Sequence, residues 1–274
     1  MCMQRFGFDF APESVSYDGK VERIQCKGID VSTYQGNIDW AKVKADGIAF
    51  AILRAGYGKL ATQVDDKFFK NYRNAKAAGV PVGAYWYSYA KTPEEAKVEA
   101  AACINTLRGT QLEYPIYYDV EENSQYKLGK ATVSAIIKAF CEAMEAEGYW
   151  VGVYTNTSWY NTVIDDVIKT KYAMWIAHWG VSKPGISGQY GLWQYGVGKN
   201  NPIPGIIGDV DLDYGYIDYP SLIKAAGRNN WPKGTDKSPE AEIIPTPDEQ
   251  PKANTINVKV EFNGKTYAGT LTEV

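Results

Sequence analysis

The segment 115–121 reads Pro-Ile-Tyr-Tyr-Asp-Val-Glu, a short apolar run that ends in two acidic residues. Seven other stretches share this pattern of strand-length apolar residues followed by a polar side chain. The eight runs are 28–31, 48–54, 80–87, 115–120, 149–154, 174–177, 191–195 and 210–212. Amphipathic helical stretches separate most of them, which predicts an α/β protein with a parallel sheet and crossover helices. Eight strands suggest that the sheet closes into a barrel.

Helix signals support this architecture but are unevenly distributed. Thr92-Pro93-Glu94-Glu95 has the form of a capping box with proline in the first turn. A stripe of apolar residues at helical spacing follows later, and Gly79, Gly109 and Gly148 are placed as helix stops. The stripe consists of Val133, Ile136, Ile137, Phe140 and Met144. Residues 174–214 are richer in strands and turns, so we expect an irregular, TIM-like (β/α) barrel with some helices missing.

Composition changes outside the barrel region. We expect an N-terminal extension at 1–26, the barrel at 27–228 and a proline-rich linker at 229–254. Residues 255–274 alternate apolar and polar side chains around Asn263-Gly264, which predicts a β-hairpin. Because an isolated hairpin is marginal in water, it must pack on the barrel, self-associate with another copy, or open a longer module.

Composition also excludes several functions. The chain has 274 residues, 45% of them hydrophobic, and a formal charge of -3, which gives no field strong enough to recruit nucleic acid or anionic lipid. No apolar run reaches the roughly 18 residues of a membrane span, and residues 1–10 lack the apolar core of a signal peptide. With His178 as the single histidine and no C-x-x-C pair, we expect no metal and no cofactor. Cys2 and Cys26 flank the extension, and a bridge between them stays open.

The acidic residues at the run ends indicate chemistry. Alternation along a strand places Asp119 and Glu121 on one face, about 6–7 Å apart. Like charges in a partly dry site raise one carboxyl pKa, so that one group carries a proton while the other is ionised. That division suits glycoside cleavage. Asp30 and Asp211 end two further runs, and burying several carboxylates together is costly without a function. Each aspartate could instead cap a loop.

Ordered motifs along the chain resemble those of the family 25 glycoside hydrolases, the lysozymes that cut bacterial peptidoglycan. They begin with Lys27-Gly28-Ile29-Asp30-Val31-Ser32 and continue through residues 50–58, 82–87, 117–121, 152–155, 175–177, 192–195 and 210–213. The resemblance covers roughly residues 27–226, and a phage-type endolysin fits it. It implies an N-acetylmuramidase that hydrolyses the β-1,4 bond between N-acetylmuramic acid and N-acetylglucosamine.

The resemblance also assigns roles by position. Glu121 would be the general acid/base, and Asp119 would orient the acetamido group of the sugar or act as nucleophile, with Asp30 and Asp211 completing the acidic floor. Asp213 stands where the family often has asparagine, so an extra acid either lies near the site or faces away from it.

Aromatic and polar residues at the run ends are candidate substrate-binding groups. These are Arg54, Tyr57, Tyr85, Tyr87, Tyr154, Trp175, Trp193 and Gln194. Arg54 either binds a carboxylate of the substrate or pairs with a neighbouring acid. Within Tyr85-Trp86-Tyr87, alternation predicts tyrosines toward the barrel axis and tryptophan toward the helices. We expect His178 to line the cleft or to bond structurally.

A function of another class remains open. Because a fold does not establish activity, the chain could be a non-catalytic wall-binding or phage structural protein on the same scaffold. In either case the expected partner is the glycan strand of peptidoglycan. Without a signal peptide, the wall would be reached by lysis, by non-standard export or as part of a phage.

Overall fold

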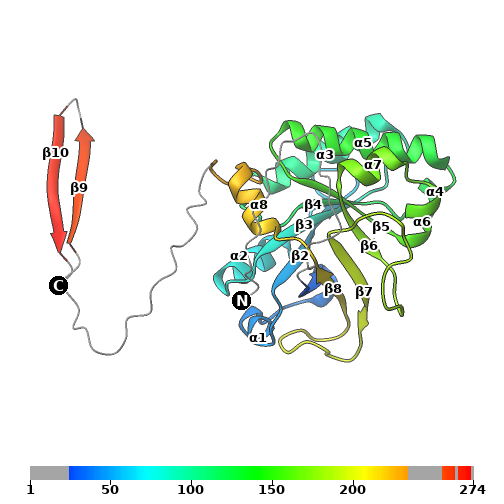
Figure 1. Ribbon diagram of the computed structural model, residues 1–274, viewed down its shortest axis with the longest axis horizontal. Helices are drawn as coiled ribbons and strands as arrows, with labels where there is room; N and C mark the ends of the chain where they lie inside the picture. The colour runs from blue at the N-terminus through cyan, green and yellow to red at the C-terminus, as the bar shows by residue number, and fades with distance from the viewer. Residues whose placement is uncertain (1–24, 234–254, 263–264, 273–274) are drawn as a thin grey trace. The chain divides into compact units, whose positions relative to one another are not determined.

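A computed structural model describes residues 25–233, 255–262 and 265–272 (Figure 1). Eight strands close into a barrel in sequence order, which confirms the expected fold. They are β1 (Cys26–Val31), β2 (Phe50–Tyr57), β3 (Val82–Tyr87), β4 (Ile116–Asp119), β5 (Val151–Asn156), β6 (Ala173–Ala177), β7 (Leu192–Gly198) and β8 (Val210–Gly215).

The direction of the last strand differs from the expectation of an all-parallel sheet. Neighbouring strands from β1 to β7 pair in parallel, whereas β8 pairs antiparallel with both β7 and β1. An antiparallel pair needs only a loop, and residues 199–209 supply that loop without a helix. As a result, the N-terminal end of β8 meets the C-terminal ends of the other seven strands at the same mouth.

Helices surround only part of the barrel. They are α1 (Trp40–Ala45), α2 (Phe68–Ala77), α3 (Pro93–Leu107), α4 (Asn123–Tyr126), α5 (Gly129–Ala146), α6 (Thr157–Thr162), α7 (Asp166–Lys171) and α8 (Tyr219–Ala226), with a short 3-10 turn, η1, at Thr33–Gln35. α3 and α5 lie side by side outside the sheet (Figure 1). No helix lies between β6 and β8 in this described part of the chain, as the run of turns predicts.

Local sequence signals act where they were expected. The Thr92 side chain accepts a hydrogen bond from the backbone N–H of Glu95 and caps α3. The Glu95 side chain accepts from the N–H of Lys91, one residue before the position that an ideal capping box would use. Gly79, Gly109 and Gly148 follow three helices with φ between 70° and 85°, a conformation that favours glycine.

The barrel interior is filled mainly by aromatic rings. Phe50, Tyr117, Tyr154 and Trp175 form a core separate from the larger one between sheet and helices. The ring of Phe50 occupies the space that a side chain at Gly28 would need. Glycine at that position therefore lets the large ring of Phe50 lie directly against β1 inside the barrel.

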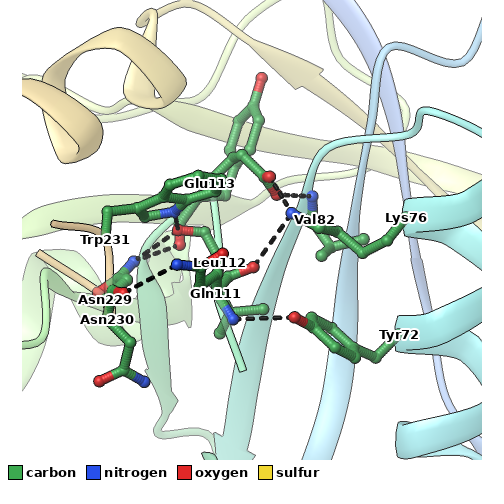
Figure 2. Close-up of polar contacts among 10 residues, drawn as sticks. Tyr72, Lys76, Val82, Gln111, Leu112, Glu113, Asn229, Asn230 and Trp231 are labelled. Carbon is green, nitrogen blue, oxygen red and sulfur yellow. Dashed lines mark hydrogen bonds and ion pairs between the residues drawn. The ribbon is translucent and has the colours of Figure 1, made fainter. Parts of the chain in front are cut away.

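The end of the barrel away from the mouth is closed by residues that follow α8. Asn229 is fully buried, and its amide joins the loops that precede β4 and β5. The Trp231 indole donates to the carbonyl of Leu112 at 3.0 Å, and its ring lies under the amine of Lys76 (Figure 2). The barrel unit therefore continues beyond the boundary expected at residue 228, and the contacts of Asn229–Trp231 are the reason.

The C-terminal strands form a unit of their own. β9 (Thr255–Phe262) and β10 (Lys265–Thr272) pair antiparallel, with Phe262 opposite Lys265, as the alternation predicts. The expected turn at 263–264, the extension at 1–24 and Cys2 lie outside the described residues, so a pairing of Cys2 with Cys26 stays a prediction. None of the described helices combines the length and apolar character that crossing a bilayer requires.

Candidate active site

A cavity of about 210 Å³ opens at the mouth of the barrel, and all eight strands or the residues just after them contribute to its wall. Its lining consists of Asp30, Val31, Ser32, Tyr34, Gln35, Arg54, Tyr85, Tyr87, Asp119, Glu121, Tyr154, Trp175, Gln194 and Asp211. The wall combines carboxylates with aromatic rings, the combination that sugar chemistry requires.

Asp119 and Glu121 leave β4 on the same face and reach the cavity together. Asp119 is the more buried, and its Oδ1 receives no hydrogen bond from the described residues. Burial, followed by the charge of Glu121, raises the pKa of Asp119 well above its usual range. Burial also raises the pKa of Glu121, with Asp211 adding to the effect and the hydroxyl of Tyr154 opposing it. Ionisation of both carboxyl groups at once is therefore harder than it would be for isolated groups.

Asp30 and Asp211 face each other across the junction of β1 and β8, where they are paired in register. Asp211 stands second in β8 and not at its C-terminal end, and only the antiparallel direction of that strand brings it to the mouth. Burial raises the pKa of both carboxyl groups, and the charges of Asp213 and Asp211 raise that of Asp30 further.

Asp213 lies beneath the cavity wall, and its side chain is fully buried. The indole N–H of Trp175 donates to its Oδ1 at 2.8 Å, while its Oδ2 receives no hydrogen bond from a described donor. Burial raises the pKa of Asp213 to about 8 despite the indole contact, which acts in the other direction. The structure thus resolves the orientation that sequence left open, because Asp213 faces the acidic floor.

The side-chain amide of Gln194 bonds to Asp30 at the base of the cavity. Gln194 donates through Nε2 to Oδ2 of Asp30 at 2.8 Å, and its Oε1 accepts from the hydroxyl of Tyr154 at 3.1 Å. The indole of Trp179 donates to the same Oε1 at 3.0 Å, although about half of the Trp179 side chain is exposed. This chain of bonds fixes the amide orientation, so Asp30 always meets a donor.

Arg54 pairs with a neighbouring acid, one of its two expected roles. Its Nε lies 2.7 Å from Oδ2 of Asp65, a carboxylate that also accepts backbone N–H groups from Thr33 and Lys67. The guanidinium still borders the cavity and lies over the ring of Tyr34, 4.9 Å from its centre. The charge of Arg54 also lowers the pKa of Asp119, against the effect of burial.

Ten of the twelve expected site residues line the cavity. Tyr57 and Trp193 do not: Tyr57 packs edge-on against Tyr89, and the Trp193 indole donates to the backbone of His178 and packs beside Tyr195 on the other face of β7. In 85–87 the two tyrosines line the cavity and the tryptophan is buried toward the helices, as alternation predicts.

Four cavity residues were not among the expected site residues: Val31, the last residue of β1, and Ser32, Tyr34 and Gln35, in or beside η1. Ser32 and Gln35 form a capping box, and this S-x-x-Q pattern directly after a strand end was the available signal. Tyr34 carried no such signal, because its ring is 81% exposed and only the fold places it over Arg54.

His178 has a structural bond, since its Nδ1 accepts the backbone N–H of Gly185 at 3.0 Å. Within the residues that the structure describes, no cluster of histidine, cysteine or acidic side chains has an arrangement that could hold a metal ion. The cavity therefore offers several carboxyl groups whose pKa is raised, together with aromatic surfaces. Those groups can protonate a leaving oxygen and stabilise a developing positive charge.

Comparisons with known proteins agree with this chemistry. The model of the family described as "Glycosyl hydrolases family 25" matches residues 29–206. The autolytic lysozyme of Clostridium acetobutylicum is 33% identical over 68% of this chain, which spans only 55% of that relative's length. Lysozyme M1 of Streptomyces globisporus is 32% identical over 70% of this chain and 68% of its own. The crystal structure of a bacterial lysozyme from Streptomyces coelicolor, 31% identical, superimposes with a TM-score of 0.62 over 75% of this chain and 97% of its own.

Proposed function

The chain belongs to family 25 of the glycosyl hydrolases, and from that premise we propose that it hydrolyses the β-1,4 bond between N-acetylmuramic acid and N-acetylglucosamine in bacterial peptidoglycan. The observation that carries the proposal is the placement of Asp119 and Glu121, two carboxyl groups with raised pKa on one wall of an open cavity. A neutral acid beside an ionised partner is what glycoside cleavage needs.

Glu121 is the proposed general acid/base. It is the less buried of the two β4 acids and borders the open cavity, where a glycosidic oxygen could reach it. In its protonated form it gives a proton to the leaving oxygen, and in its ionised form it then takes a proton from the attacking water.

Asp119 is the proposed partner at the reacting sugar. Its free Oδ1 can accept the N–H of a substrate acetamido group or meet the anomeric carbon directly. Either contact supports the positive charge that builds at that carbon. Asp30 and Asp211 contribute further negative potential, while Tyr85, Tyr87 and Tyr154 offer ring surfaces to the sugars.

The test is the variant Glu121→Gln, which keeps the side-chain shape and removes the acid. We expect product release from purified peptidoglycan to fall by about 10²–10⁴-fold, the usual contribution of general acid–base catalysis, with wall binding retained. Glu142→Gln is the matched control, because Glu142 is an exposed residue on α5. Mass spectrometry of the products identifies the bond, since a muramidase leaves muramic acid at the new reducing ends.

The other outcomes are distinct. Products with glucosamine at the reducing end would show that the other glycosidic bond of the glycan strand is cleaved. Free peptides would indicate an amidase. A wild-type protein that binds the wall but releases nothing would be a binding or structural protein. Near-normal turnover in Glu121→Gln would refute the role given to Glu121.

A further inference from the structure

One acid of the floor has no role in the proposed mechanism, and that acid is Asp213. It is fully buried, its Oδ1 is held by the Trp175 indole, and its Oδ2 faces no described donor. Asp213 lies two residues from Asp211, the register partner of Asp30, and directly opposite Gln194, whose amide donates to Asp30, so the two acids are neighbours on the inner face of the sheet. Burial of such a carboxyl group destabilises the fold unless a neighbouring group bonds to it.

A hydrogen bond between two carboxyl groups requires a proton, because two carboxylates offer only acceptor atoms. Each member of this pair has one oxygen already occupied by a fixed donor. Gln194 donates to Oδ2 of Asp30, and Trp175 donates to Oδ1 of Asp213. The geometry leaves Oδ2 of Asp213 as the atom that meets Asp30.

We propose that Asp213 is a positioning residue that shares one proton with Asp30 and thereby holds the Asp30 carboxyl in a single orientation at the cavity floor. The inference rests on the proposed function and assigns Asp213 a part in it. With Gln194 on one oxygen and the shared proton on the other, Asp30 cannot rotate when substrate enters. Trp175 secures the pair from below, and its ring also lines the cavity.

Among the described residues, no lysine or arginine is one of the main charges that act on Asp30 or Asp213. The titratable groups that interact electrostatically with the pair are Asp211 on β8, Tyr85 on β3, Tyr117 on β4, Tyr154 on β5 and, on the other face of β7, Tyr195. Burial raises the pKa of all four tyrosines, so they stay neutral, and Asp211 adds negative charge. Arg54 is engaged by Asp65. The pair therefore keeps its proton through neutral pH, consistent with the pKa of about 8 for Asp213.

Two substitutions separate positioning from simple packing. Asp213→Asn keeps a donor toward Asp30 whose proton cannot dissociate, and Asp213→Leu removes the donor at similar volume. On purified peptidoglycan at pH 6, we expect Asp213→Leu to lose at least about tenfold in kcat, and Asp213→Asn to recover most of that loss. Above about pH 8, the wild type also loses the shared proton, so the ratio of Asp213→Asn to wild-type kcat/KM rises about tenfold per pH unit.

The pH dependence of unfolding needs no substrate, so it tests the shared proton independently of the proposed function. Unfolding releases the proton of the pair, so the unfolding constant of the wild type between pH 5 and 7 should depend on pH by about one proton more than that of the double variant Asp30→Asn/Asp213→Asn, a tenfold difference per pH unit. Asp46→Asn, at an exposed helix end, is the control and should match the wild type.

The outcomes can be told apart. A constant activity ratio from pH 7 to 10, or equal proton release by the wild type and the double variant, would overturn the shared proton while leaving the muramidase assignment intact. If the wild type releases no muramyl ends, the assignment fails, and the unfolding measurement alone decides about the pair.

Discussion

The buried Oδ1 of Asp119 destabilises the fold, but it is available to the substrate. It receives no hydrogen bond from the described residues, and burial together with Glu121 raises the carboxyl pKa. Such a group destabilises the native state whenever it is forced to ionise. The resting protein thus holds an acceptor ready for a substrate group, at the expense of stability.

Substitution of Asp119 should therefore lower activity and raise stability. Asp119→Asn removes the ionisable group, so we expect activity to fall by at least about 100-fold and the free energy of unfolding at pH 8 to rise by about 1 kcal/mol. Urea denaturation at pH 8 and reducing-end release measure the two effects. Asp46→Asn serves as the exposed control. A variant that loses activity and stability together would show that Asp119 supports the fold instead.

At this scale, the sequence identified most of the site. Asp30, Glu121 and Gln194 were recognisable because each follows or ends an apolar run, where barrel enzymes place working groups. The position of Tyr34 depends on a three-residue turn after β1, and that of Trp179 on a bond to Gln194 across a loop. Such contacts depend on how the loops fold, and no periodicity in the sequence predicts them.

Among the elements, β8 illustrates what periodicity cannot supply. Residues 210–212 have an apolar and acidic pattern that predicts a strand but not its direction. The absence of a helical stretch between 199 and 209 was the available sign of an antiparallel return. Direction matters here, because a parallel β8 would carry Asp211 to the opposite end of the barrel.

The segment after α8 yields a prediction about the closed end of the barrel. Asn229 adopts φ 54°, its Nδ2 donates to the carbonyl of Tyr114, and its Oδ1 accepts the N–H of Trp150 at 2.7 Å. Asn229→Ala should lower the free energy of unfolding by about 2–4 kcal/mol, because buried backbone groups lose their partners and the left-handed conformation becomes strained.

Two further variants separate the contribution of the hydrogen bonds from that of the backbone conformation. Asn229→Gly tolerates the conformation and lacks the amide, whereas Asn229→Asp keeps the acceptor and lacks the donors. We expect both to be destabilised, measured by urea midpoints, with kcat at low temperature close to that of the wild type. A large fall in kcat without unfolding would mean that the closed end communicates with the mouth.

For the barrel as a whole, the acids of the mouth determine how stability varies with pH. Burial raises the pKa of Asp30, Asp119 and Asp213 above unfolded values near 4, so the native state binds more protons than the unfolded chain. Their favourable contribution is complete below about pH 4 and is lost as pH rises through the folded pKa values. We expect the free energy of unfolding to fall between pH 5 and 8, by about 1.4 kcal/mol per pH unit for each proton released.

Chemical denaturation across that range measures the slope. Acids whose pKa is lowered, such as Asp39 and Asp166, affect stability only at lower pH and do not mask it. A flat profile, or stability that increases toward pH 8, would show that the mouth acids are ionised in the native state.

The two compact units of the chain, residues 1–236 and 237–274, lead to a further expectation. Deletion of residues 237–274 should leave cleavage of solubilised wall fragments within about twofold of the full chain, because every cavity residue belongs to the first unit. If the hairpin binds the wall or self-associates, activity on whole cells should fall, or the sedimentation coefficient should decrease beyond the change in mass. Failure of the shortened chain to fold would place the hairpin within the barrel's core.

The anchoring of Trp231 between the amines of Lys76 and Lys224 has a practical consequence for protein engineering. The main chain departs from the catalytic unit at the pole opposite the substrate entrance, so a foreign module grafted after residue 233 would start its path well clear of an incoming glycan. Attachment of a wall-binding segment at this junction should therefore change which surfaces the protein reaches without changing the proposed cleavage.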